Sequence, residues 1–252
     1  MVGFSFAVEE KEAWYVAVSS NREEALKMVS IFKPLYEDGH ILKIGQNIKY
    51  DIEVLHNYGI AVKGQLFDTM LAHYIIQPEL HHGMDYLAEV YLGYQTVHIE
   101  ELIGPKGKKQ KNMRDLPPTD IYEYACEDAD VTLRLYHALE PKLKEVGGER
   151  LFWEIEMPLV TVLAEMEETG VRLDTEALQD TSRVFNERMR QYEAHIYQEA
   201  GEEFNISSPK QVGDILFGKL QLVEKPKKTK TGQYVTSEEV LQSLSPKHPI
   251  VA

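Results

Sequence analysis

The first third of the chain alternates short extended patterns with amphipathic ones. Two runs rich in β-branched and aromatic residues, Val2–Val8 and Ala13–Val18, flank a charged turn, and this arrangement predicts a β-hairpin. Asn21 then precedes apolar positions at helical spacing, which predicts a capped helix. A further strand is predicted at Ile41–Ile44, with a helix over residues 49–58 behind it. The alternation of strands and helices predicts an α/β architecture of stacked layers.

Beyond residue 68 the apolar spacing is almost wholly helical. Gly170 breaks the pattern, and Asp174 is suited to cap the helix that follows it. The predicted helices cover residues 69–76, 84–91, 119–144, 150–168, 175–200, 209–217 and 237–244. A domain boundary is expected at the Gly147-Gly148 pair, so that residues 1–147 form a mixed α/β domain and residues 148–252 an all-α region.

Composition narrows the class of protein. With 252 residues, of which 43% are hydrophobic and 27% charged, the chain can bury a substantial core. Its apolar runs fall short of the roughly 18 to 20 residues that a membrane helix needs, and its first residues lack the pattern of a signal peptide. We therefore expect a cytoplasmic protein without a membrane partner. Cys126 is the single cysteine, so an internal disulfide and a cysteine-rich zinc site are excluded.

The charge distribution bears on nucleic-acid binding in two opposite ways. The net charge of -14 disfavours a phosphate-bearing partner, because such partners are bound mainly by Lys and Arg. Two loop-like segments run against this average: Gly104–Arg114 has five basic residues and no acidic one, and Lys219–Lys230 has five lysines against Glu224. On composition alone both are ordinary solvated loops.

Two acidic positions are candidates for hydrolytic chemistry. Asp51 follows a predicted strand and a polar turn, at the start of a helix, where an aspartate is usually a cap. Tyr124 and Asp128 are four residues apart in a predicted helix and therefore share one face, an arrangement that is also common on solvated helices. Carboxylates of this kind are the oxygen ligands that Mg²⁺ prefers.

Taken together, these segments resemble a known family. The sequences GQNIKYD (residues 45–51) and YACEDADVT (residues 124–132) resemble the second and third motifs of the proofreading 3′-5′ exonuclease domain of bacterial family A DNA polymerases. Collinear similarity continues through residues 154–174, 200–217 and 236–244. The resemblance implies a ribonuclease H-like exonuclease domain over residues 1–147 and, over residues 148–252, the start of a polymerase domain with its thumb helices.

The resemblance also implies roles for individual residues. Asp51 and Asp128 would bind catalytic Mg²⁺ or Mn²⁺, and Tyr124 would orient the attacking water. Gln46 and Asn47 would contact the single-stranded 3′ end of DNA. The thumb would hold duplex DNA with the lysines of its loop, which are Lys225, Lys227, Lys228 and Lys230.

The chain departs from the family at its first motif, a strand carrying Asp-x-Glu. That strand is expected upstream of Val2–Val8, and the Phe67-Asp68-Thr69 segment does not replace it because Met70 stands where the Glu is needed; Asp68 is predicted to be a helix cap. We therefore expect a fragment that is inactive by itself and binds metal weakly or not at all. The sheet would close the gap, recruit a strand from another copy, or leave edges exposed. No oligomeric state is indicated.

Two other functions fit part of the pattern. A catalytically silent exonuclease-like domain could serve as a DNA-binding scaffold, and the identity of the residues at the Asp-x-Glu motif would distinguish it from an enzyme. A stand-alone exoribonuclease of the same Asp/Tyr type would lack polymerase-like sequence after residue 150.

Overall fold

The computed structural model describes residues 1–251 and divides into two compact units, Met1–Gly170 and Val171–Ala252. This division follows the packing of the chain, and the domain boundary expected after residue 147 stays a prediction. Across the described residues, no helix is both long and apolar enough to cross a membrane.

The first unit contains two small sheets. Strands β1 (Gly3–Glu9) and β2 (Glu12–Ala17) form the predicted antiparallel hairpin. Strand β3 (Lys43–Gly45) pairs in parallel with β4 (Leu66–Asp68), which the sequence pattern did not reveal. Within residues 1–251 no strand pairing joins the two sheets.

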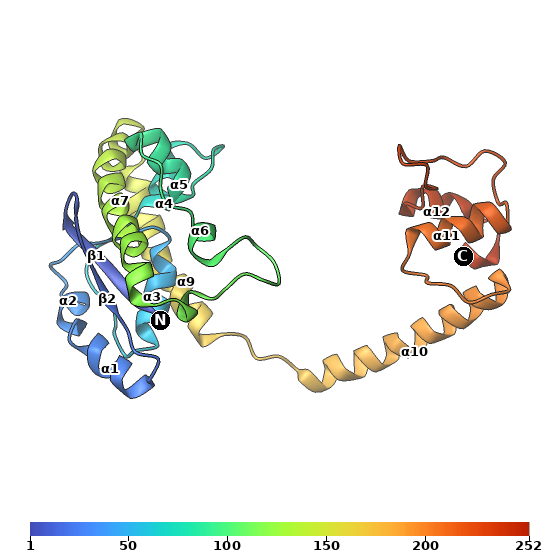
Figure 1. Ribbon diagram of the computed structural model, residues 1–252, viewed down its shortest axis with the longest axis horizontal. Coiled ribbons are helices and arrows are strands. Elements are labelled where there is room, and N and C mark those ends of the chain that lie inside the picture. Colours follow the sequence, from blue (N-terminus) through green and yellow to red (C-terminus); the bar gives the residue numbers. More distant parts are fainter. Residues whose placement is uncertain (252) are drawn as a thin grey trace. The chain divides into compact units, whose positions relative to one another are not determined.

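Helices make up most of the rest of the first unit (Figure 1). They are α1 (Arg22–Ser30), α2 (Lys33–Glu37), α3 (Ile48–His56), α4 (Thr69–Ile76), α5 (Met84–Leu87), the π-helical turn η1 (Ala88–Leu92), α6 (Ile99–Ile103), the 3-10 turn η2 (Met113–Asp115), α7 (Pro118–Glu145), α8 (Glu149–Leu151), the π-helical turn η3 (Phe152–Glu156) and α9 (Met157–Thr169). The mixed α/β class is thus confirmed. The run after Asn21 is two helices with a break before Pro34, and α6 was not predicted.

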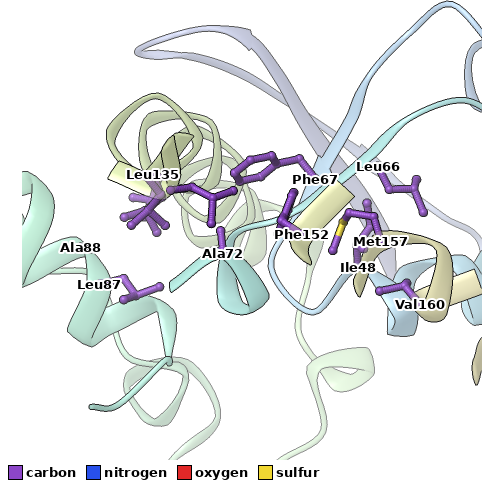
Figure 2. Close-up of a cluster of buried hydrophobic side chains, with 13 residues drawn as sticks. Ile48, Leu66, Phe67, Ala72, Leu87, Ala88, Leu135, Phe152, Met157 and Val160 are labelled. Carbon is purple, nitrogen blue, oxygen red and sulfur yellow. The ribbon is translucent and has the colours of Figure 1, made fainter. Parts of the chain in front are cut away.

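The core of the first unit forms around one face of α7. Val131, Leu135, Leu139 and Leu143 are fully buried and recur at every fourth position, which places them along one side of the helix. They belong to the same cluster as Phe67 of β4, whose ring packs against Phe152 and other aromatic rings. Figure 2 shows Leu135, Phe67 and Phe152 in this cluster. Burying each such side chain stabilises the fold by about 1.5 to 3 kcal/mol.

The second unit is helical, as predicted. It comprises α10 (Thr175–Ala200), α11 (Pro209–Gly213), the π-helical turn η4 (Asp214–Lys219), α12 (Glu238–Leu244) and the 3-10 turn η5 (Pro249–Val251). Asp174 caps α10 by accepting a hydrogen bond from the Ala177 N–H, as expected. A separate core gathers Ala200, Phe217 and Leu244 with their neighbours.

Candidate functional site

Asp68 holds together the corner between α3 and α4, next to which Asp51 lies. Its side chain is 1% exposed and accepts backbone N–H groups at both ends of the corner: Asn47 (3.2 Å), Ile48 (2.8 Å), Met70 (2.9 Å) and Leu71 (3.3 Å). It therefore caps α4, as predicted, and also fixes the start of α3. Burial raises the pKa of Asp68, and the four backbone donors oppose that rise.

Asp51 lies in the first turn of α3, after a sharp bend. Asn47 adopts the left-handed conformation at φ 59°. A Cβ atom at position 45 would lie 2.8 Å from the Ile48 Cβ, so the bend requires glycine at this position. The residue keeps an exposed surface, yet partial burial of its carboxyl and the nearby charge of Asp68 raise the pKa of Asp51 to about 6. An accessible carboxylate that is poorly solvated gains by binding a cation.

The side-chain amides of Gln46 and Asn47 differ in how accessible they are to a ligand. Gln46 donates to the His82 carbonyl at 2.7 Å and accepts from the Thr69 hydroxyl, so both ends of its amide are bonded inside the protein. Asn47 is exposed, and its side chain makes no capping bond to α3. Their contact with DNA stays a prediction, and Asn47 is the more accessible of the two.

Tyr124 and Asp128 form a half-buried pair one turn apart on α7. Both side chains are half-buried, and the nearby charge of Asp128 acts on the phenol of Tyr124. Burial raises the pKa of Asp128 to about 7; the neighbouring hydroxyl of Tyr124 opposes that rise, and the charges of Glu127 and Asp85 add to it. Burial and the same carboxylates raise the pKa of Tyr124, which keeps its hydroxyl protonated at neutral pH.

A strap of residues 94–98 lies beside this pair and was not foreseen. Glu127 accepts the Tyr94 hydroxyl at 2.7 Å and the Val97 N–H at 2.8 Å. At the other side Asp85 accepts the Thr96 hydroxyl at 2.7 Å and pairs with His98 Nδ1 at 2.9 Å. Spacing could not identify these contacts, because about 30 residues separate Glu127 from the strap.

The structure does not bring Asp51 and Asp128 into one cluster of charges. Asp68 is the carboxylate whose charge acts on Asp51, whereas Glu127 and Asp85 are those that act on Asp128. Over residues 1–251 no group of three or more His, Cys, Asp or Glu is placed to hold a metal ion. The carboxylates have the right chemistry for Mg²⁺ but not the number, so these residues alone do not fit a divalent cation.

The four predicted thumb lysines lie in the second unit and are exposed. Part of their segment is a narrow hairpin: Lys228 bridges to Tyr234, the Val235 N–H donates to the Lys227 carbonyl at 3.0 Å, and the Lys228 ammonium lies 4.7 Å from the Tyr234 ring centre. Lys225, Lys227, Lys228 and Lys230 are all open to solvent. Their geometry allows phosphate contact, which stays a prediction.

Comparison with known families now identifies the class. The model of the 3′-5′ exonuclease family matches residues 1–144, and that of DNA polymerase family A matches residues 175–252. The chain therefore belongs to the 3′-5′ exonuclease family, in the form found in family A DNA polymerases. The resemblance drawn from the two motifs is confirmed.

Its relatives are bacterial enzymes named DNA polymerase I. The chain is 43% identical to that of Pseudomonas aeruginosa, over 97% of this chain and 28% of the relative, and 37% identical to that of Bacillus subtilis, over 100% and 27%. It is similar to the solved POL domain of Pol1 from M. smegmatis in complex with DNA primer-template and dNTP, at a TM-score of 0.70 and 27% identity, over 95% of this chain and 38% of that one.

Two consequences follow from these matches. The chain spans about a quarter of the length of the curated relatives, between 21% and 28% for those most similar. The family A match over residues 175–252 contradicts the stand-alone exoribonuclease, which would have a different sequence there.

Proposed function

We propose that the Tyr124–Asp128 face of α7, together with Asp51, belongs to a site that removes nucleotides from the 3′ end of single-stranded DNA. The site would act in a polymerase that also extends DNA. The observation that carries this proposal is the half-buried Tyr124–Asp128 pair, one turn apart on α7, in which a phenol stays protonated beside a carboxyl whose pKa is raised to about 7. Strongly shifted groups of this kind concentrate at functional sites.

Each residue would have its own part in the reaction. The protonated hydroxyl of Tyr124, oriented by Asp128, would position the water that attacks the terminal phosphodiester. Asp51, at the start of α3, and Asn47, exposed in the bend before it, would lie along the path of the strand end. Gln46 would act indirectly. Its side-chain amide donates to the His82 carbonyl and so holds the bend that carries Asn47 in place.

A divalent cation, Mg²⁺ or Mn²⁺, is the cofactor that such a site would use. When bound, it would supply a more acidic water and neutralise charge on the phosphate. In the whole polymerase Asp51 and Asp128 would each offer a carboxylate to such cations, and neither would complete a metal site by itself. Because these two carboxylates do not make a complete metal site, we expect the chain alone not to trim DNA.

The second unit would contact duplex DNA. The M. smegmatis relative was solved with a DNA primer-template, and the exposed lysines 225, 227, 228 and 230 present charge suited to the phosphate backbone. A polymerase of this kind would work in the bacterial cytoplasm, and residues 148–252 would form the start of its polymerase domain.

The test separates the two activities in the whole polymerase. Asp128→Asn and Tyr124→Phe should each reduce trimming of a single-stranded oligonucleotide by at least about a hundredfold, the size of effect expected for a group that takes part in proton transfer. Primer extension by the same preparations should be unchanged. Both rates are measured with Mg²⁺ and with Mn²⁺.

Glu123→Gln provides the matched control. Glu123 is exposed on the same helix and bonds only its neighbour Tyr122 in the described structure, so this change should alter neither rate. Undiminished trimming by Asp128→Asn would contradict the site assignment, whereas no trimming by the unchanged polymerase would favour the silent DNA-binding scaffold. Robust trimming by the present chain alone would contradict the count of metal ligands.

A further inference from the structure

Residues 104–114, here called the basic loop, concentrate positive charge in the first unit. Lys106, Lys108, Lys109, Lys111 and Arg114 are all exposed, and the segment contains no acidic residue. Figure 1 shows the stretch between α6 and α7 standing clear of the neighbouring helices. In a chain of net charge -14 such a segment is a local reversal of sign.

The cations of the basic loop are largely unneutralised. Lys106 lies 3.8 Å from Glu100, a long contact that is worth little at an exposed position. The other four make no ion pair within residues 1–251. Positive groups that the protein leaves unpaired are free to meet an anionic partner.

The backbone gives the basic loop a defined shape. The Lys111 N–H donates to the Ile103 carbonyl at 2.9 Å, and the Gln110 amide donates to the Gly104 carbonyl at 3.1 Å, so the loop closes at its base. Asn112 then caps the turn η2 by accepting the Arg114 N–H at 3.0 Å. Side chains on such a closed loop lose less freedom on binding than those on an open tail.

Both ends of the basic loop lead to the Tyr124–Asp128 pair. On one side the strap of residues 94–98, held by Glu127 and Asp85, runs directly into α6, which packs against α7. On the other side the chain enters α7 at Pro118, less than two turns before Tyr124. The loop is thus anchored at the helix that carries the candidate site.

The charges of the basic loop and of the candidate site indicate the chemistry of the partner. The carboxylates at and around the candidate site would repel a phosphate backbone, so a strand whose end reaches Asp128 needs compensating charge nearby. We propose that the basic loop binds the sugar–phosphate backbone of single-stranded nucleic acid and holds the strand while its 3′ end lies at the Tyr124–Asp128 pair. The second clause rests on the proposed function; the first does not.

A binding measurement on the present chain tests the loop without any catalysis. The variant Lys108→Gln/Lys109→Gln/Lys111→Gln is titrated against a fluorescein-labelled twelve-nucleotide oligothymidine, by anisotropy, from 0.05 to 0.4 M salt. Three lost phosphate contacts should reduce the slope of log K against log salt by about 2 and weaken binding at 0.1 M salt by roughly 10- to 100-fold. The arginine version of the same triple change should retain binding.

A matched variant makes the result specific to the basic loop. Lys27→Gln/Lys63→Gln/Lys144→Gln removes the same charge from three exposed positions of the first unit outside the basic loop and should weaken single-strand binding much less. Equal losses in the two triple variants, or an unchanged salt slope in the first, would overturn the proposal. Circular dichroism of each variant shows that the fold is kept.

Trimming by the whole polymerase separates this inference from the proposed function. There the loop variant should raise KM for a single-stranded substrate about tenfold or more and leave kcat unchanged. If Asp128→Asn still trims while the loop variant binds weakly, the site assignment fails and the binding loop stands. If Asp128→Asn loses trimming while the loop variant binds normally, the proposed role of the basic loop is wrong and the site assignment is kept.

Discussion

Helices α7 and α10 are nearly equal in length, with 28 and 26 residues, but differ in what covers them. Seven residues of α7 are buried, whereas Ala200 is the one buried residue of α10. Along α10 the side chains of Leu178, Phe185, Met189 and Tyr192 are exposed. The spacing of apolar residues predicted both helices, so amphipathic spacing specifies a helix and an apolar face but not the surface that will cover that face.

The capping residues of the two units show the same contrast. Asp68, before α4, is buried and accepts four backbone N–H groups. Asp174, before α10, is exposed and accepts one. Both were predicted as caps, yet one connects two helices across a corner and the other only begins a helix.

Removing a core side chain from α7 should have the largest effect. Leu135 is 0% exposed, and Leu135→Ala should lower the free energy of unfolding of the first unit by about 2 to 5 kcal/mol, because a cavity replaces packed atoms. The chain's two tryptophans, Trp14 and Trp153, both lie in this unit, so urea titration followed by tryptophan fluorescence reports its unfolding.

The corresponding change in α10 is the control. Phe185 is 57% exposed, and Phe185→Ala should alter stability by no more than about 0.5 kcal/mol, measured by urea titration with circular dichroism. A loss as large as that of Leu135→Ala would mean that the apolar face of α10 is covered in solution, and the contrast between the helices would disappear.

The two caps should differ by a smaller amount. Asp68→Ala leaves several backbone donors without a partner in a buried corner and should cost about 1 to 3 kcal/mol. Asp174→Ala removes one exposed capping bond and should cost about 1 kcal/mol. Chemical denaturation of both variants provides the measurement, and a greater loss from Asp174→Ala would contradict the bridging role of Asp68.

Local chemistry explains which parts of the structure the sequence could predict. Helix α4 was predicted over its observed residues because an aspartate cap precedes a mostly apolar run. Strand β4 was missed because its three residues, Leu66–Asp68, are defined by pairing with β3 and carry no periodicity of their own. The same holds for the strap on Glu127 and Asp85, whose contacts join segments far apart in sequence.

The residues of the candidate site also differ in how far the sequence could predict their neighbours. Tyr124 and Asp128 share a face because they are one turn apart, and this could be predicted from spacing alone. Spacing contains no information on the neighbours of Asp51, which were inferred from resemblance. The structure gives Asp51 a different set of charged neighbours from that of Asp128.

The smallest of these effects is a pH dependence that α7 should impose. The pKa of Asp128 rises from an ordinary 3.8 to about 7 on folding, so between these values the folded state keeps a proton that the unfolded chain has released. The free energy of unfolding should therefore fall as pH rises through this window and level off above pH 7, and Asp51, with a pKa of about 6, contributes with the same sign at lower pH. Asp128→Asn should remove a fall of at most about 1 kcal/mol between pH 6 and pH 7. A profile that Asp128→Asn does not alter would mean that folding does not raise the pKa of this carboxyl, and the distinction between the two helices would then be limited to their apolar faces.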